Sequence, residues 1–202
     1  MKMNILSFVA VIGLLLCSFV SSEKGYNVGD EARDFSLKNV DGDIVSMSDY
    51  DDAEGIILIF TCNTCPYSKM YEQRIIELND NYQPKGFPVL AVNSNDKLKS
   101  PGDTFEEMVK LAQSKGYKFP YLYDETQEIA KIYGATNTPH VYVLKKMNDR
   151  FNVAYIGAID DNSRSAKAAT RKYVEEAVDA LLMNKFITTK MTKAIGCTIK
   201  WK

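Results

Sequence analysis

Residues 55–68 decide the fold, and they read Gly-Ile-Ile-Leu-Ile-Phe-Thr-Cys-Asn-Thr-Cys-Pro-Tyr-Ser. The run from Gly55 to Thr61 is continuously apolar and rich in β-branched side chains, which predicts a strand buried on both faces. Pro66 directly follows the second cysteine and suits the first position of a helix. We therefore expect a buried strand that leads through Cys62 and Cys65 into a helix over residues 66–82.

The two cysteines of this stretch are the candidate catalytic residues. Cys65 falls at the predicted N-terminus of the helix, where the helix dipole and free backbone N–H groups stabilise a thiolate. A thiol with a lowered pKa is the nucleophile that disulfide exchange requires. A disulfide between Cys62 and Cys65 needs Cα atoms roughly 4.4–6.8 Å apart, whereas an extended three-residue span covers about 10 Å. The pair can close only if the loop between strand and helix turns.

Outward from this junction, strands and helices alternate along the chain. Asp41-Gly42 separates two strand patterns, residues 34–40 and 43–47, and predicts a β-hairpin. Further strands are expected at 88–92, 119–123, 140–144 and 152–159, and further helices at 104–115 with Asp103 as N-cap, 126–133 and 165–183. This order predicts an α/β fold with a mainly parallel core sheet and helices on both faces. The last two strands are expected to form an antiparallel hairpin that turns near Asn148-Asp149.

Composition sets limits on the function. The chain has 202 residues, 46% of them hydrophobic, which fits one globular domain. Its 25 basic and 26 acidic residues leave a formal charge of −1, so a nucleic-acid partner is not expected. A single histidine argues against His-rich metal sites, and we expect no cofactor.

The N-terminal segment is treated apart from the fold. Lys2 precedes a mostly apolar run over residues 5–20, and small residues follow, which predicts a signal peptide over residues 1–22. A retained membrane anchor and lipid attachment at Cys17 are the alternatives. We therefore expect a periplasmic or secreted protein, associated with a membrane only if this segment is retained. The expected mature chain is a domain over 23–184 followed by a tail over 185–202.

The dipeptide Thr138-Pro139 lies just before a predicted strand and is a candidate cis peptide. Together with the Cys-x-x-Cys-Pro junction and the final amphipathic helix, it resembles the thioredoxin-like superfamily. The sequences of residues 29–35 and 119–124 are similar to its redoxin branch, which includes alkyl-hydroperoxide-reductase, thiol-specific-antioxidant and TlpA/ResA-like proteins. The resemblance covers about residues 26–184. It implies a central mixed sheet, a reactive cysteine at a helix N-terminus, and a cis Pro139 that shapes a substrate groove with Thr138 beside Cys65.

The chain departs from the superfamily pattern in three respects. In one alignment Cys65 is the nucleophile and Ser68 falls where a resolving cysteine belongs; in the other, Cys62 attacks as the first member of the classical pair. We prefer Cys65, because Pro66 fixes the helix start beside it. Ile59 stands where thioredoxins place a buried acid. Relative to the peroxiredoxin pattern, Leu58 and Cys62 replace a proline and a threonine.

Cys197, in the C-terminal tail, is the third thiol of the expected mature chain. It is a candidate resolving cysteine for Cys65 or Cys62, and the alternative is a free or structural cysteine. Cys62 and Cys65 themselves could instead form a permanent structural disulfide. A zinc site made of Cys62, Cys65, Cys197 and His140 is a further alternative. We otherwise expect His140 to be a strand residue near the groove.

Three functions follow from these patterns. The first is an exported thiol–disulfide oxidoreductase, which acts on a protein or small-molecule disulfide and needs an upstream thiol reductant. The second is a thiol peroxidase with Cys65 as the peroxidatic residue. The third is a non-catalytic thioredoxin-like module for binding or metal delivery.

Overall fold

The computed structural model describes residues 25–202. The predicted signal peptide and Cys17 lie outside the described residues. Within them, no helix is long and apolar enough to cross a membrane. The division into a domain ending at residue 184 and a separate tail stays a prediction.

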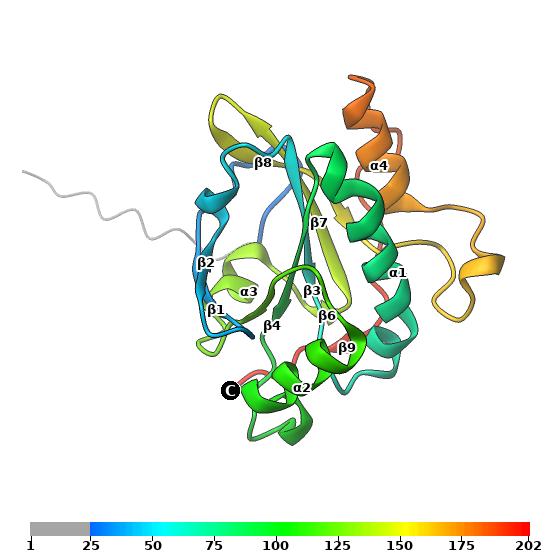
Figure 1. Ribbon diagram of the computed structural model, residues 1–202. Helices are drawn as coiled ribbons and strands as arrows, with labels where there is room; N and C mark the ends of the chain where they lie inside the picture. Colours follow the sequence, from blue (N-terminus) through cyan, green and yellow to red (C-terminus); the bar gives the residue numbers. More distant parts are fainter. Residues whose placement is uncertain (1–24) are drawn as a thin grey trace, which may run out of the picture.

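The centre of the molecule is a sheet with the strand order β2-β1-β5-β4-β3-β7-β8 (Figure 1). β3, β4 and β5 run parallel, while β1 joins β5 and β7 joins β3 in antiparallel pairing. The sheet is therefore mixed, as the resemblance implied, and the expectation of a mainly parallel sheet holds only for its three central strands. The strands are β1 (Ser36–Asn39), β2 (Ile44–Ser46), β3 (Gly55–Phe60), β4 (Val89–Asn93), β5 (Tyr121–Tyr123), β7 (His140–Met147) and β8 (Arg150–Gly157).

Both predicted hairpins are confirmed. β1 and β2 pair antiparallel around the Asp41-Gly42 turn, and β7 and β8 pair antiparallel around Asn148-Asp149. Asn148 and Asp149 both have positive φ, the backbone conformation of a tight hairpin turn that Asn and Asp tolerate.

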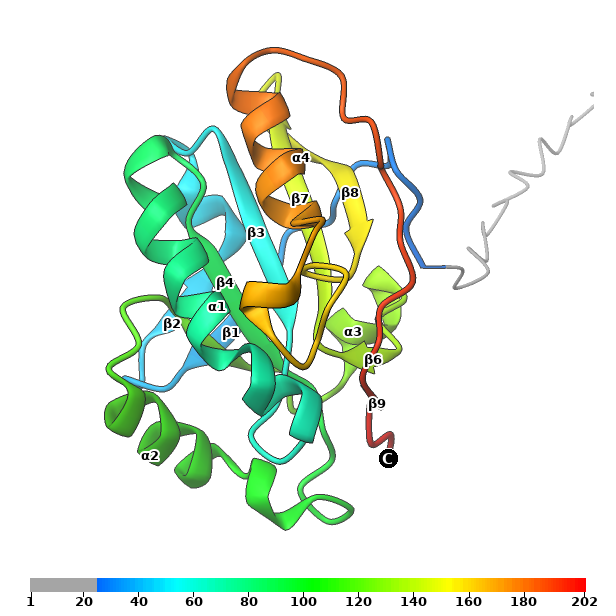
Figure 2. The ribbon, with the colours of Figure 1, turned by 90° about the vertical axis from the view of Figure 1, so that its right-hand side faces the viewer.

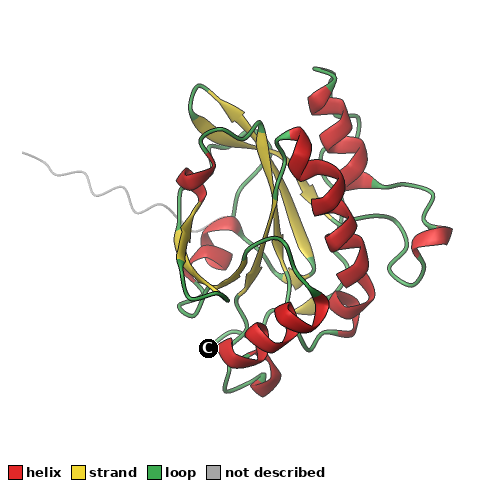
Figure 3. Cartoon of the chain, in the orientation of Figure 1, coloured by secondary structure: helices red, strands yellow, loops and turns green. Residues whose placement is uncertain are grey.

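Helices cover both faces of the sheet (Figures 2 and 3). β3 is buried along its whole length and sends alternate side chains to two cores. Ile57 and Ile59 face the core shared with α1, α2 and α4, and Leu58 and Phe60 face the core shared with α3. The helices are α1 (Pro66–Tyr82), α2 (Phe105–Lys115), α3 (Glu128–Tyr133) and α4 (Tyr173–Leu182).

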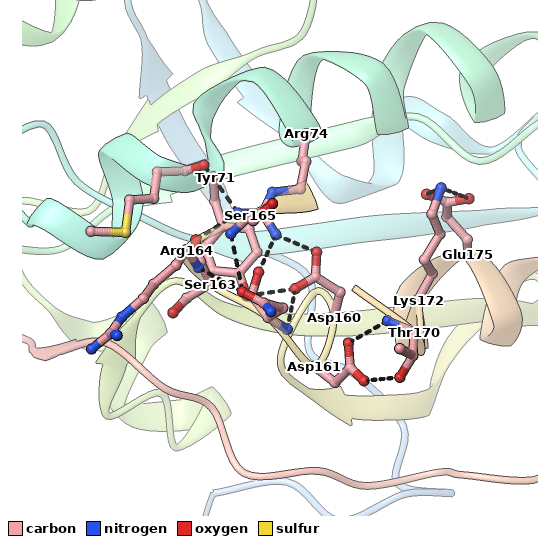
Figure 4. A network of polar contacts seen from close by, with 12 residues as sticks. Tyr71, Arg74, Asp160, Asp161, Ser163, Arg164, Ser165, Thr170, Lys172 and Glu175 are labelled. Atoms are coloured by element: carbon pink, nitrogen blue, oxygen red, sulfur yellow. Dashed lines mark hydrogen bonds and ion pairs between the residues drawn. The ribbon is translucent and has the colours of Figure 1, made fainter. Parts of the chain in front are cut away.

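Two predictions about helix starts are wrong. The helix expected from residue 165 begins only at Tyr173, because the preceding segment is held in a loop by other contacts. Arg74 of α1 donates to the carbonyl oxygens of Asn162 and Ser163, and the Asp161 carboxylate accepts from Thr170 (Figure 4). Asp103 does not cap α2 either: Thr104 does, accepting from the Glu107 N–H.

A second, two-stranded sheet joins distant parts of the chain. β6 (Asn137–Thr138) pairs antiparallel with β9 (Cys197–Thr198), near the C-terminus. The peptide bond between Thr138 and Pro139 is cis, as the resemblance implied. Figure 2 shows the C-terminal segment running from α4 past β8 to this pairing.

Candidate active site

Cys62 and Cys65 lie where the buried strand β3 passes into helix α1. β3 ends at Phe60, and α1 begins at Pro66 with Cys65 as its N-cap residue. The loop turns between the two, as a reversible disulfide would require. Each cysteine is only 3% exposed. The junction therefore presents two sulfurs to the interior of the site rather than to open solvent.

The segment before the cis proline contacts both sulfurs. The Cys62 Sγ lies 3.2 Å from the Thr138 hydroxyl and 3.7 Å from the Ser68 hydroxyl. In its thiol form, Cys65 donates to the Thr138 carbonyl oxygen at 3.2 Å. Thr138 thus holds Cys62 through its side chain and Cys65 through its backbone, beside Pro139.

Cys197 reaches the same place from the C-terminus. The β6–β9 register sets Cys197 opposite Thr138, whose carbonyl oxygen lies 3.2 Å from the Cys65 Sγ, and Cys197 contributes to lowering the pKa of Cys65. Cys197 is partly exposed, unlike the other two cysteines. The structure therefore brings all three thiols of the described chain together around Thr138, although their separate roles stay predictions.

The three thiols differ in acidity. Hydrogen bonding from Cys62 lowers the pKa of Cys65 to about 4 against the opposing effect of burial, and contacts from Cys197 and the Ser68 backbone act in the same direction. The hydrogen bond to Cys65, burial and the charge of Asp103 raise the pKa of Cys62. Burial and the neighbouring Cys65 raise the pKa of Cys197 to about 11. These effects favour ionisation of Cys65 over ionisation of Cys62 or Cys197.

Asp103 organises the loop between the cysteines. Its side chain is fully buried and accepts from the Asn63 backbone N–H at 2.6 Å and from the Thr64 hydroxyl at 2.7 Å. Asn93, Asn95 and Ser100 also donate to it. Burial raises the pKa of Asp103, but these hydrogen bonds outweigh burial and hold the pKa below its ordinary value. An ionised carboxylate thus lies close to Cys62.

Sequence reasoning missed this role of Asp103 and treated the residue as a helix cap. It noted that Ile59 replaces the buried acid of thioredoxins, and the structure provides a buried acid from a different element. One signal was available: the polar run Asn93–Asp96 directly follows a buried parallel strand, at the same sheet edge as the cysteines.

His140 lies at the start of β7, as expected, and is buried. Its Nδ1 accepts from the Thr136 backbone N–H at 3.4 Å, and burial lowers the pKa of the ring to about 4. His140 is therefore a neutral imidazole at physiological pH. Among residues 25–202, no group of three or more His, Cys, Asp or Glu side chains is arranged to hold a metal ion.

Comparisons with known proteins agree with this geometry. The profile of the AhpC/TSA family matches residues 28–173. The thiol-disulfide oxidoreductase ResA of Bacillus thuringiensis subsp. konkukian is 25% identical over 155 residues, which cover 72% of this chain and 85% of that protein.

Solved structures show the same fold. An uncharacterized conserved protein from Geobacillus kaustophilus superimposes with a TM-score of 0.80 at 39% identity, covering 87% of this chain and 93% of the other. The exposed lipoprotein thioredoxin of Streptococcus pneumoniae has a TM-score of 0.55 at 17% identity, covering 73% and 99% of the two chains. The thioredoxin-like fold expected from the sequence is confirmed.

Proposed function

The chain belongs to the AhpC/TSA family, and we propose that it is a thioredoxin-like thiol–disulfide oxidoreductase with Cys65 as its nucleophile. One observation carries the proposal: Cys65 is the N-cap residue of α1 and contacts Thr138 beside the cis proline, and Cys62 and Cys197 lie at the same threonine. The pKa of Cys65 is lowered, whereas the pKa values of the other two thiols are raised. A thiolate attacks disulfides and a thiol does not. The similarity to a thiol-disulfide oxidoreductase supports the same reaction.

The reaction takes two exchange steps. The Cys65 thiolate attacks one sulfur of a disulfide, forms a mixed disulfide and releases the other half as a thiolate, which takes a proton. Cys62 then loses its proton and attacks the Cys65 sulfur, so that the product thiol leaves and a Cys62–Cys65 disulfide remains. A protein or small-molecule disulfide is thereby reduced, and an upstream thiol reductant restores the dithiol.

Asp103 favours this assignment over the one in which Cys62 attacks first. A buried carboxylate beside Cys62 disfavours a second negative charge there. Cys62 gives up its proton more easily once Cys65 is in a mixed disulfide, because the neighbouring thiolate has then disappeared. Cys65 therefore attacks first as the thiolate, and Cys62 loses its proton and attacks second, after the charge on Cys65 has been removed.

The test compares the wild type with Cys65→Ser and Cys62→Ser in the reduction of insulin by dithiothreitol. We expect Cys65→Ser to abolish catalysis and Cys62→Ser to accumulate a mixed disulfide at Cys65. Alkylation with iodoacetamide at pH 6, mapped by mass spectrometry, should modify Cys65 before the other two. Equal insulin reduction by wild type and Cys65→Ser would refute the proposal.

Thiol peroxidase activity is the second candidate, because the sequence resembles alkyl-hydroperoxide-reductase-like proteins and the pKa of Cys65 is lowered. In that reaction a peroxide oxidises Cys65 to a sulfenic acid, and Cys62 or Cys197 condenses with it to a disulfide and water. The hydroxyls of Thr138 and Ser68 contact Cys62 rather than Cys65, so Cys65 lacks their help in binding peroxide. Stopped-flow mixing with hydrogen peroxide decides: a rate no faster than that of a free thiol excludes this activity.

We further propose that the protein is exported. The support is the sequence of residues 1–22, in which Lys2 precedes an apolar run followed by small residues. Fractionation of the source cell, with N-terminal sequencing of the mature chain, tests this. Recovery of the protein from the cytoplasm with residue 1 or 2 at its N-terminus would overturn it.

A further inference from the structure

The C-terminal segment lies against the reactive cysteine as one strand of a sheet. β9 pairs with β6 immediately before the cis proline, with Cys197 opposite Thr138. The approach is so close that a Cβ at Gly196 would lie 2.0 Å from the Thr138 carbonyl oxygen. The Asn137 side chain adds a hydrogen bond to the Gly196 carbonyl oxygen at 3.0 Å. Glycine at 196 therefore allows the backbone contact that sets Cys197 on Cys65.

The chain beyond Cys197 is firmly attached. Ile199 is 3% exposed and packs in the core on the α3 side of the sheet, and its N–H donates to the Thr136 carbonyl oxygen at 3.0 Å. The Lys200 N–H donates to the Asn95 side chain, and the Lys200 carbonyl oxygen accepts from the Gln127 side chain, both at 2.8 Å. Gln127 also accepts from the Lys202 N–H at 2.8 Å. These contacts hold the C-terminal segment in a fixed position beside the three cysteines.

This arrangement controls access to the thiols. Cys62 and Cys65 are each 3% exposed, and Cys197 is the only one of the three that is more than marginally exposed. The backbone of β9 also occupies the pairing edge of β6, so an external peptide strand has no place to pair beside Pro139 while β9 is bound. An incoming disulfide meets Cys197 before it can meet Cys65.

We propose that Cys197 is the thiol at which external disulfides enter the site, with a Cys65–Cys197 disulfide as the intermediate that carries the exchange to the buried pair. The inference rests on the proposed function and deepens it: the disulfide that Cys65 attacks is one that Cys197 carries. The substrate class is an accessible disulfide of a small molecule or of a flexible protein segment that reaches the partly exposed sulfur.

The sequence has three exchanges. Cys197 first loses its proton to solvent, and because its pKa is raised only a small fraction is ionised at neutral pH. This thiolate attacks an external disulfide, forms a mixed disulfide and expels one external thiolate. The Cys65 thiolate attacks the Cys197 sulfur, forms the Cys65–Cys197 bond and expels the second external thiolate. Cys62 then attacks Cys65 and expels Cys197. Two electrons pass from Cys62 and Cys65 to the external disulfide, and the two product thiols take one proton from Cys62 and one from solvent.

The geometry also suits the reverse direction. An external thiolate that attacks the Cys65–Cys197 bond at the accessible Cys197 sulfur expels Cys65, the group with the lowest pKa of the three. Thiols of low pKa leave fastest in disulfide exchange. Entry through Cys197 therefore uses the most accessible sulfur as the point of attack and the most acidic one as the leaving group.

The decisive experiment is rapid quench of the reduced full chain with oxidised glutathione, followed by mass mapping. If Cys197 is the entry thiol, Cys197→Ser slows release of the first glutathione at least ~10-fold, because exchange needs an accessible sulfur. Cys65→Ser should accumulate glutathione on Cys197. Thr198→Ser, a neighbouring exposed position on the same strand, is the matched control and should behave as wild type.

The outcomes separate the inference from the function on which it rests. If Cys197→Ser releases the first glutathione at the wild-type rate and carries it on Cys65, Cys197 is not the entry thiol, although Cys65 remains the nucleophile. Faster release in Cys197→Ser also overturns the inference, because the segment would then only cover Cys65. If the wild type forms no Cys62–Cys65 disulfide with oxidised glutathione, the proposed function itself fails.

Discussion

Two buried carboxylates are stabilised in different ways: Asp160, which contacts helix α1, and Asp103, which contacts the loop before it. Asp160 forms an ion pair with Arg74 and accepts from the Tyr71 hydroxyl at 2.8 Å (Figure 4). Asp103 accepts only from neutral donors: a backbone N–H, two hydroxyls and two amides. Both acids are nearly inaccessible, at 5% and 0% exposure. One negative charge is therefore compensated by a cation and the other by hydrogen bonds alone.

The difference shows how a buried charge acts beyond its own contacts. The Arg74 guanidinium cancels much of the field of Asp160, so this pair mainly fastens the loop after β8 to α1 through the carbonyl oxygens of Asn162 and Ser163. The charge of Asp103 is not cancelled, and it raises the pKa of Cys62. One carboxylate supports the fold, and the other also adds to the effects that keep Cys62 protonated.

Removal of the cation should give the largest effect on stability. Arg74→Met leaves Asp160 as an unpaired buried charge, which we expect to cost about 3–5 kcal/mol of unfolding free energy. Urea denaturation followed by circular dichroism measures it. Asp160→Asn in the Arg74→Met background is the control and should recover a substantial part of the loss. A loss below about 1 kcal/mol, the typical value of an exposed pair, would mean that the ion pair is not buried in solution.

The next effect is a dependence of stability on pH that originates at Cys65. Its pKa falls from 9.0 to about 4 on folding, so between these values the unfolded chain binds a proton that the folded chain does not. The contribution of Cys65 to the free energy of unfolding is fully present above pH 9, decreases as the pH falls, and is lost near pH 4. Between pH 8 and pH 6 we expect a loss of about 3 kcal/mol.

The comparison is made with Cys65→Ser, measured by urea denaturation at both pH values under reducing conditions. The variant should lose this part of the pH dependence. His140, whose pKa is lowered to about 4 by burial, contributes an equal slope in both proteins and cancels from the difference. Parallel pH profiles for the two proteins would show that Cys65 is not ionised in the folded state.

Asp103→Asn tests the uncompensated carboxylate directly. The two carboxylate oxygens of Asp103 accept from five donors, whereas the asparagine amide has only one acceptor oxygen. We therefore expect the free energy of unfolding to fall by about 2 kcal/mol. Loss of the charge should also lower the pKa of Cys62, so that its alkylation begins at a lower pH while Cys65 still reacts first. Mass-mapped alkylation across pH gives both curves. Arg74→Met is the contrasting variant. An equal shift of the Cys62 alkylation curve in that variant would mean that the shift in Asp103→Asn is not due to the charge of Asp103.

The same distinction explains what could be predicted from the sequence. The exact span of α1, the buried strand β3 and both hairpins followed from local signals: Pro66, a continuous apolar run, and the Asp41-Gly42 and Asn148-Asp149 turns. The thioredoxin-like fold followed from the family resemblance carried by the Cys-x-x-Cys-Pro junction, Thr138-Pro139 and the final amphipathic helix. Each of these features depends on residues close together in the chain.

The features that escaped prediction depend on contacts between distant segments. Asp103 has the sequence appearance of a helix cap, and only the folded chain brings Asn63 and Thr64 to it from about forty positions away. The loop over residues 165–172 was expected to be helical together with α4, but Thr170 instead donates to the Asp161 carboxylate from its N–H and its hydroxyl. The thiol of Cys197 was recognised as a candidate, whereas its strand pairing with Thr138 has no local sequence signal.

The smallest effect concerns the attachment of the C-terminal segment, which also relies on neutral hydrogen bonds. Gln127 is 1% exposed and bonds to the Lys200 carbonyl oxygen and the Lys202 N–H. The Lys200 carbonyl oxygen keeps its bond from the Asp96 N–H in Gln127→Ala, so we expect a cost of only about 1 kcal/mol. If local opening of this segment exposes Cys65, that cost increases the open population about fivefold. Alkylation of Cys65 at fixed pH should accelerate by the same factor.

Arg74→Met, although far more destabilising overall, should leave the rate of Cys65 alkylation unchanged while the protein stays folded, because Arg74 does not contact the C-terminal segment. Equal acceleration in both variants would mean that Cys65 is exposed by global unfolding, and that the C-terminal segment does not control access to it.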